Sequence, residues 1–113
     1  MENMEISLDD VGGVSVVTLK GRLNVTTTAE LEKTFSTLLS ENKTKVLLDF
    51  RQLEYISSAG LRVLLAAAKQ FKKVSGRIVL SSLVPSVKQV FEISGFTSIF
   101  PIFSTRDEAV KSF

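Results

Sequence analysis

Apolar and polar side chains alternate with a period of two near the start of the chain. Residues 4–8 alternate strictly, residues 9–13 are rich in Asp and Gly, and residues 14–19 are mostly β-branched. Two such runs joined by a glycine-containing turn are typical of paired antiparallel strands. The pattern therefore predicts an opening β-hairpin.

The period then changes to that of an amphipathic helix. Thr27 and Glu30 have the spacing of a capping box, in which the two side chains satisfy free backbone N–H groups at a helix start. The apolar residues that follow recur at i, i+4, i+7 and i+8. They are Leu31, Phe35, Leu38 and Leu39. We expect a helix that begins at this box and ends near Asn42.

The middle of the chain changes from a strand pattern to a helix pattern and back. Residues 46–50 are nearly all apolar, as expected of a central parallel strand that is buried on both faces. A short polar loop should follow this strand. Residues 58–74 are rich in Leu and Ala, contain no Pro and stop before Gly76, which predicts a second helix. Residues 77–81 return to a strand pattern.

Proline, glycine and threonine mark the elements near the end of the chain. Pro85 suits the first position of a third helix, and Gly95 suits its left-handed C-terminal cap. Pro101 lies in the apolar run 99–103 and cannot donate to a ladder, which predicts an edge strand. Thr105 begins a second capping box and with it a short terminal helix.

The resulting element order is ββαβαβαβα, with strands and helices alternating after the hairpin. Such an order implies right-handed crossovers and a mostly parallel sheet. We expect an α/β fold with a mixed sheet of about five strands, an N-terminal antiparallel hairpin and about four helices. A chain of 113 residues with 44% hydrophobic residues fits one domain, spanning residues 1–113.

The composition excludes several classes of chemistry. The chain has no Cys and no His, which excludes thiol catalysis, disulfides, zinc sites built on Cys or His, and a Ser-His-Asp triad. It also lacks a phosphate loop of the GxxxxGK[ST] type. We therefore expect a protein that is not an enzyme and that holds no cofactor or metal ion. Without a signal sequence or a long apolar run, we expect it in the cytoplasm and away from membranes.

The net charge of +2 conceals an asymmetry between the two halves of the chain. Residues 1–56 hold six Lys/Arg against nine Asp/Glu, whereas residues 57–113 hold eight against three. The basic half lacks the clustered Arg and the interleaved aromatic residues of a nucleic-acid surface. We therefore expect no nucleic-acid partner, and an acidic protein fits this half better.

Two serines, Ser57 and Ser58, come where the second helix should begin. Functional sites in open α/β sheets collect at the carboxyl ends of strands, and a helix N-terminus favours an anion such as phosphate. Serine is also a preferred helix cap. The two serines therefore fit either a phosphorylation site or a plain cap.

A helical projection places a basic stripe below Ser58. Four basic residues lie within about 60° of Ser58 on this projection. They are Arg62, Lys69, Lys72 and Lys73. Leu65 falls within the same stripe, so we expect it to be at least partly exposed. The stripe fits either a solvated face or a docking face for an acidic partner, with Leu65 as the apolar contact.

Four separated motifs make the chain similar to one family over nearly its whole length. Residues 17–24 resemble an early strand with a "G-x-L-D" turn, and residues 48–50 resemble a central strand. Residues 56–61 resemble a "D-S-[AST]-G-L" signature, and residues 80–96 resemble the third helix with its flanks. Together these motifs resemble the STAS domain of bacterial anti-sigma factor antagonists.

The resemblance implies a partner switch. In this family the unphosphorylated antagonist binds an anti-sigma factor that is also a serine kinase, which frees the sigma factor. The kinase then phosphorylates the antagonist and releases it, and a metal-dependent serine phosphatase resets the cycle. The acceptor serine of the family corresponds to Ser58. We expect the partner to bind at Asn24, Ser57 and Ser58, which match the family motifs, and at Arg62, Leu65 and Lys69 of the projected stripe.

The chain departs from the family at two positions and leaves a second role open. Ser57 stands where the signature has Asp, and Asn24 stands where the early turn has Asp, so two acids near the acceptor are missing. STAS domains also serve as assembly subunits in stressosome scaffolds and transporters, where phosphorylation is not essential. The resemblance therefore implies an antagonist or, alternatively, a scaffold subunit.

Overall fold

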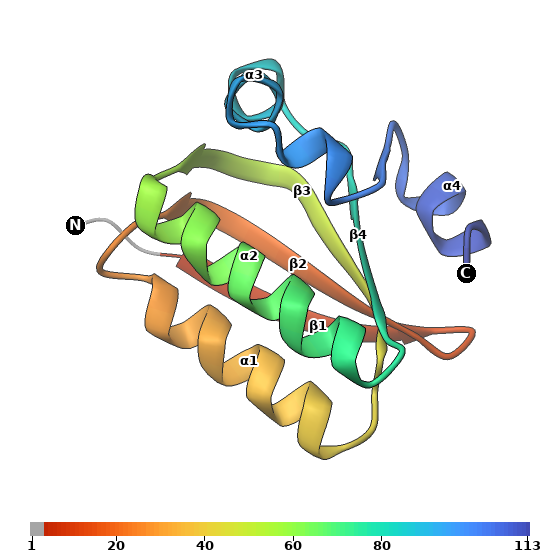
Figure 1. Ribbon diagram of the computed structural model, residues 1–113. Coiled ribbons are helices and arrows are strands. Elements are labelled where there is room, and N and C mark those ends of the chain that lie inside the picture. Colours follow the sequence, from red (N-terminus) through yellow and green to blue (C-terminus); the bar gives the residue numbers. More distant parts are fainter. Residues whose placement is uncertain (1–3) are drawn as a thin grey trace.

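The computed structural model describes residues 4–113, which form a five-stranded sheet and four α-helices (Figure 1). The strands are β1 (Met4–Val11), β2 (Val14–Leu23), β3 (Lys45–Ile56), β4 (Arg77–Ser81) and β5 (Ile102–Phe103). The helices are α1 (Thr28–Ser40), α2 (Ser58–Lys73), α3 (Pro85–Ser94) and α4 (Arg106–Lys111). A short 3-10 helix, η1 (Phe96–Ser98), follows α3.

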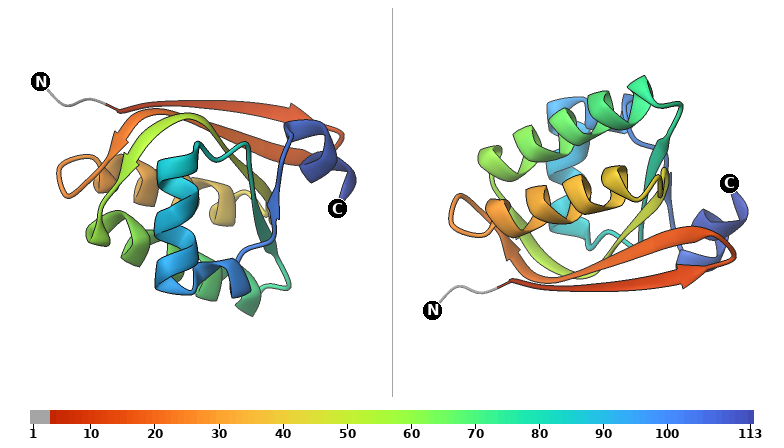
Figure 2. Two further views of the ribbon diagram at one scale, coloured as in Figure 1. Left: turned by 90° about the horizontal axis from the view of Figure 1, so that it is seen from above. Right: turned by 90° about the horizontal axis from the view of Figure 1, so that it is seen from below.

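The strands are arranged in the sheet in their sequence order, β1-β2-β3-β4-β5. β1 and β2 are antiparallel, and every later neighbouring pair is parallel. Right-handed crossovers that always advance in one direction place their helices on one face of the sheet. Figure 2 shows α1 and α2 side by side on that face. The predicted hairpin, the mixed sheet and the edge position of the last strand are confirmed.

The main core lies between this helical face and the sheet. Its largest members include Phe50, Phe91 and Phe100. The centre of the Phe91 ring lies 6.0 Å from the centre of the Phe50 ring and 6.4 Å from that of the Phe100 ring. A smaller core on the opposite face lies beneath α4 and includes Leu47 and Val79. β3 is therefore buried on both faces over residues 46–50, as its apolar run predicted.

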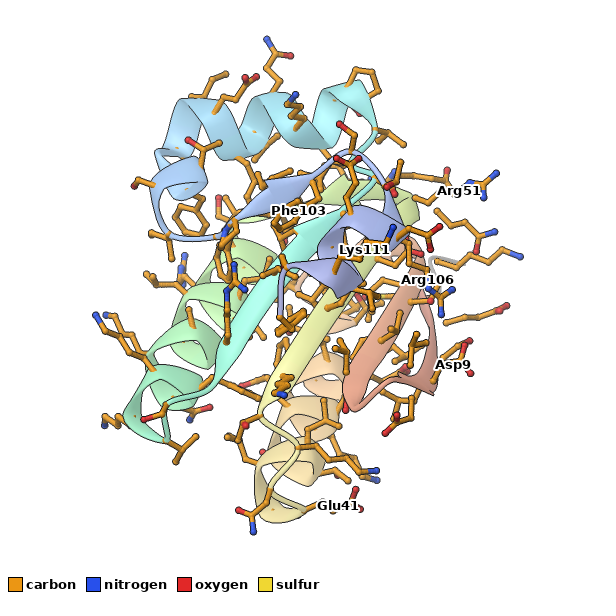
Figure 3. All side chains as sticks on the ribbon, turned by 90° about the vertical axis from the view of Figure 1, so that its right-hand side faces the viewer. Asp9, Glu41, Arg51, Phe103, Arg106 and Lys111 are labelled. Carbon is orange, nitrogen blue, oxygen red and sulfur yellow. The ribbon has the colours of Figure 1, made fainter. Side chains whose placement is uncertain are left out.

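α4 covers only one end of this opposite face. Ala109 of α4 is fully buried against the sheet. Arg106 of α4 and Asp9 of β1, which lie on the same side of the molecule in Figure 3, form an ion pair of 3.5 Å between exposed side chains. Such surface pairs contribute little to stability, so the packing of Ala109, with Val110 and Phe113 beside it, contributes more to holding the helix in place.

Two of the predicted strand boundaries are wrong. β3 does not end in a polar loop after Phe50; it continues to Ile56, because β2 runs beside it with Arg22 opposite Tyr55. β5 contains two residues instead of the five predicted. Ile99 and Phe100 instead donate backbone hydrogen bonds to the carbonyl of Phe96 and close the turn after η1.

The two predicted capping boxes have different outcomes. Thr105 caps α4: its hydroxyl accepts from the backbone N–H of Glu108 at 3.1 Å. The box at Thr27 is wrong. The Thr27 hydroxyl accepts from the N–H of Asn24 and donates to the carbonyl of Arg22, both at 2.9 Å. This hydroxyl therefore orders the preceding loop and makes no bond to α1.

Candidate functional site

The start of α2 is attached to the carboxyl ends of β2 and β3. Ile56 ends β3, and the backbone N–H of Ser57 donates to the carbonyl of Leu23, the last residue of β2, at 2.9 Å. The loop between β2 and α1 begins at Asn24, the residue after Leu23. The N-terminus of α2 and this loop therefore lie next to each other at one end of the sheet.

The two serines have different structural roles. Ser57 is the N-cap of α2: it has extended backbone angles, and its hydroxyl accepts from the N–H of Gly60 at 3.2 Å. Ser58 is the first helical residue and is exposed. Its hydroxyl makes no hydrogen bond within residues 4–113. The capping role belongs to Ser57, which leaves the Ser58 hydroxyl available for other chemistry.

Gly60 brings α2 into close contact with the ends of the two strands. A Cβ atom at this position would lie 2.9 Å from Cγ of Leu23 and 2.9 Å from Cγ1 of Ile56. These side chains belong to the buried core, so they have little room to move. The absence of a side chain at Gly60 therefore allows the first turn of α2 to lie close to the ends of β2 and β3, and this sets the position of Ser58.

Asn24 shapes the neighbouring loop from within. It is buried, and its side-chain oxygen accepts from the backbone N–H of Thr26 at 3.0 Å and from the Thr26 hydroxyl at 2.7 Å. The loop that it orders exposes 76% of Val25. Nothing in the fold tests whether Asn24 contacts a partner, and that role stays a prediction. Val25 was not identified from the sequence.

Arg22 and Tyr55 form a second feature that the sequence did not indicate. They face each other across β2 and β3, with the guanidinium carbon of Arg22 4.2 Å from the centre of the Tyr55 ring. Their neighbours Leu23 and Ile56 belong to the core under α2, so the pair points to the other face of the sheet. Cation–π contact holds the Arg22 charge over Tyr55, which is 40% exposed.

The predicted basic stripe is confirmed as an exposed face of α2. Arg62, Lys69, Lys72 and Lys73 are all exposed, and Leu65 is partly exposed. The opposite face is buried through Gly60, Leu64, Ala67 and Phe71. Leu65 and Lys69 also line a groove farther along the helix, so they are not in the immediate surroundings of Ser58.

The electrostatic surroundings of Ser58 favour an anion. The first turn of α2 contains no acidic residue, and Arg62 lies one turn farther along the helix. The free N–H groups of a helix N-terminus carry about half a positive charge, which stabilises phosphate near that end. A phosphate on Ser58 would therefore meet attractive groups within the first turn of its own helix.

Comparison with known proteins assigns the family. Residues 5–109 match the STAS domain family. The chain belongs to this family. BtrV of Bordetella bronchiseptica, which is named as an anti-sigma factor antagonist, is 42% identical over 110 residues, covering 97% of this chain and 95% of BtrV. The resemblance that the motifs indicated is thereby confirmed.

Solved structures show that this STAS domain has the fold of known antagonists. An anti-sigma factor antagonist from Mycobacterium paratuberculosis has a TM-score of 0.89 at 24% identity, covering 97% of this chain and 93% of that one. SpoIIAA from Bacillus in its phosphorylated form has a TM-score of 0.76 at 24% identity, covering 96% and 98%. The predicted fold class is confirmed.

Residues 4–113 show neither a metal-binding cluster nor a membrane-spanning helix. No group of three acidic side chains in this part of the STAS domain could hold a metal ion. No helix in the same range is long and apolar enough to cross a membrane.

Proposed function

We propose that this STAS domain is an anti-sigma factor antagonist controlled by phosphorylation of Ser58. In its unphosphorylated form it binds, in the cytoplasm, an anti-sigma factor that is also a serine kinase, which frees a sigma factor. The kinase phosphorylates Ser58 and is released, and a serine phosphatase restores the first state. The observation that carries this proposal is the exposed position of Ser58, whose hydroxyl makes no hydrogen bond within residues 4–113, beside the capping hydroxyl of Ser57.

The relatives support this proposal by their names. BtrV is named as an anti-sigma factor antagonist, and so is RsfB of Mycobacterium tuberculosis, which is 24% identical over 110 residues. SpoIIAA has been solved in both an unphosphorylated and a phosphorylated form, so a protein of this fold can carry phosphate and stay folded. The same cycle in this chain needs one accessible hydroxyl and a partner surface around it.

The proposed partner surface extends from Ser58 along α2 and onto the neighbouring loop. Ser57, Ser58 and Arg62 form its centre, and Leu65 and Lys69 form its far end. Val25 adds an exposed apolar side chain from the loop that Asn24 orders. Exposed apolar contacts within a basic surface suit a partner with acidic and apolar side chains.

The kinase is expected to phosphorylate Ser58 and not Ser57. The Ser57 hydroxyl accepts a hydrogen bond from the backbone N–H of Gly60 in a partly buried position, whereas Ser58 is an exposed residue. Mass spectrometry of the protein after incubation with its cognate kinase and Mg-ATP should place the phosphate on Ser58. Ser58→Ala should abolish incorporation, and Ser57→Ala should retain it. A phosphopeptide carrying phosphate on Ser57 alone would contradict this assignment.

Phosphorylation is expected to leave the melting temperature unchanged or slightly raised. The phosphate meets the N-terminus of α2 and Arg62, contacts that are typically worth about 0.3 to 2 kcal/mol. No acidic residue in the first turn opposes them. Calorimetric melting of the phosphorylated and unphosphorylated proteins measures the difference. A fall of many degrees would show that phosphate disrupts the packing around Ser58.

A further inference from the structure

A groove of about 590 Å³ lies along the second half of α2, away from Ser58. One wall is formed by α2, and the other by the start of β4 and by residues 98–101, which follow η1. Two segments far apart in the sequence therefore form one concave surface.

The lining of the groove is largely apolar. Leu65 and Ala68 of α2 line it together with Ile99 and Pro101. Ile99 is 42% exposed although it is a large apolar side chain. A groove with apolar side chains on both walls can accept an apolar side chain from another molecule and remove it from water.

The charges around the groove have one sign. Lys69, Lys72 and Arg77 line it, and none of its lining residues is acidic. Arg77 is held in place because its guanidinium donates to the backbone carbonyl of Ser112 at 2.6 Å. The groove therefore complements a ligand that combines negative charge with apolar side chains.

These features favour an acidic protein segment over a nucleic acid. Single-stranded nucleic acids bind by stacking their bases on exposed aromatic side chains. The one aromatic residue in the lining, Phe100, is 1% exposed and belongs to the core. The apolar lining is instead made of aliphatic side chains and a proline, which suit leucine-like side chains of a peptide.

The groove is also electrostatically separate from Ser58. Lys69 lies eleven residues after Ser58 on α2, which corresponds to roughly 16 Å along the helix axis. The screening length at physiological ionic strength is about 8 Å. A phosphate on Ser58 therefore has little influence on the charges of the groove.

We propose that this groove binds an acidic segment of a partner protein that inserts a large apolar side chain between Leu65 and Ile99. Lys69 and Lys72 hold the acidic side chains of this segment. Binding persists when Ser58 is phosphorylated. The groove therefore provides a contact for a partner whose binding does not depend on the state of Ser58. This inference does not require the phosphorylation cycle to exist.

Fluorescence anisotropy with three labelled decapeptides tests the proposal. The first alternates glutamate with leucine and contains one phenylalanine, the second replaces the apolar residues by serine, and the third replaces glutamate by lysine. The first peptide should bind at least tenfold more tightly than the other two. Ser58→Asp should change its affinity by less than twofold. Binding that is lost on Ser58→Asp would overturn the separation from the phosphorylation site.

Two pairs of variants locate the binding. Ile99→Ser should weaken the first peptide at least fivefold, whereas Ile93→Ser should not, because Ile93 is 79% exposed on α3 and lies outside the groove. Lys69→Glu should weaken binding of the first peptide at least fivefold. Lys33→Glu makes the same charge change on α1, outside the groove, and should have little effect on this binding. Equal effects within either pair would overturn the proposal.

Discussion

Ser58→Asp is expected to weaken binding to the anti-sigma factor by roughly two to three and a half orders of magnitude. A partner docked on α2 and the neighbouring loop covers Ser58, so a carboxylate there must lose its water on binding. It also repels acidic side chains of the partner that Arg62, one turn away, attracts. These two costs together amount to about 3 to 5 kcal/mol. Isothermal titration calorimetry with the cognate anti-sigma factor measures the change.

Two other variants separate charge from shape at this surface. Ser58→Ala removes the hydroxyl without adding charge, so it should bind almost normally and resist release by the kinase. Leu65→Ala should weaken binding without unfolding the domain, because Leu65 is only partly buried. If Ser58→Asp bound as tightly as the parent protein, exclusion by charge would be wrong, and a scaffold role without a phosphorylation cycle would fit better.

Gly60→Val is expected to lower the free energy of unfolding by about 2 to 3 kcal/mol. The Cβ atom alone would lie 2.9 Å from carbon atoms of both Leu23 and Ile56, and the two methyl groups add further contacts. Valine gains only about 0.4 kcal/mol of helix propensity over glycine, which is too little to offset this overpacking. The first turn of α2 must move outward, which also displaces Ser58 and should weaken partner binding.

Urea unfolding of Gly60→Val beside Ala66→Val measures this effect. Ala66 lies on the exposed side of the same helix, so its replacement adds a β-branched residue without a steric clash. We expect the control to lose no more than about 0.7 kcal/mol, which reflects helix propensity alone. An equal loss for the two variants would show that α2 does not depend on close contact at Gly60.

Local patterns predicted most of the fold because the elements carry their own signals. The alternation over residues 4–8, the Leu- and Ala-rich run after Ser58, and Gly95 with its left-handed φ of 79° all correspond to observed elements. The end of β3 was missed because a partner strand decides it. Residues 51–56 are polar and would form a loop alone, but β2 continues beside them and extends β3.

The candidate site was only partly predictable for a related reason. The exposed positions of Ser58 and Arg62 follow from the period of one helix, and the sequence contains that period. The exposure of Val25 depends on the shape of its loop, and the groove beside Ile99 forms where segments far apart in the sequence come together. No hydrophobic periodicity predicts either feature. The Thr27 hydroxyl shows the same limit, because its bonds to the preceding loop replaced the capping role that its spacing predicted.

The most direct test of the proposed switch compares the protein with and without phosphate on Ser58. Calorimetric titration of each form into the same anti-sigma factor measures two dissociation constants under one set of conditions. We expect the phosphorylated form to bind at least a hundredfold more weakly, while its circular dichroism spectrum and melting temperature match those of the unphosphorylated form. Equal dissociation constants for the two forms would contradict a switch at Ser58.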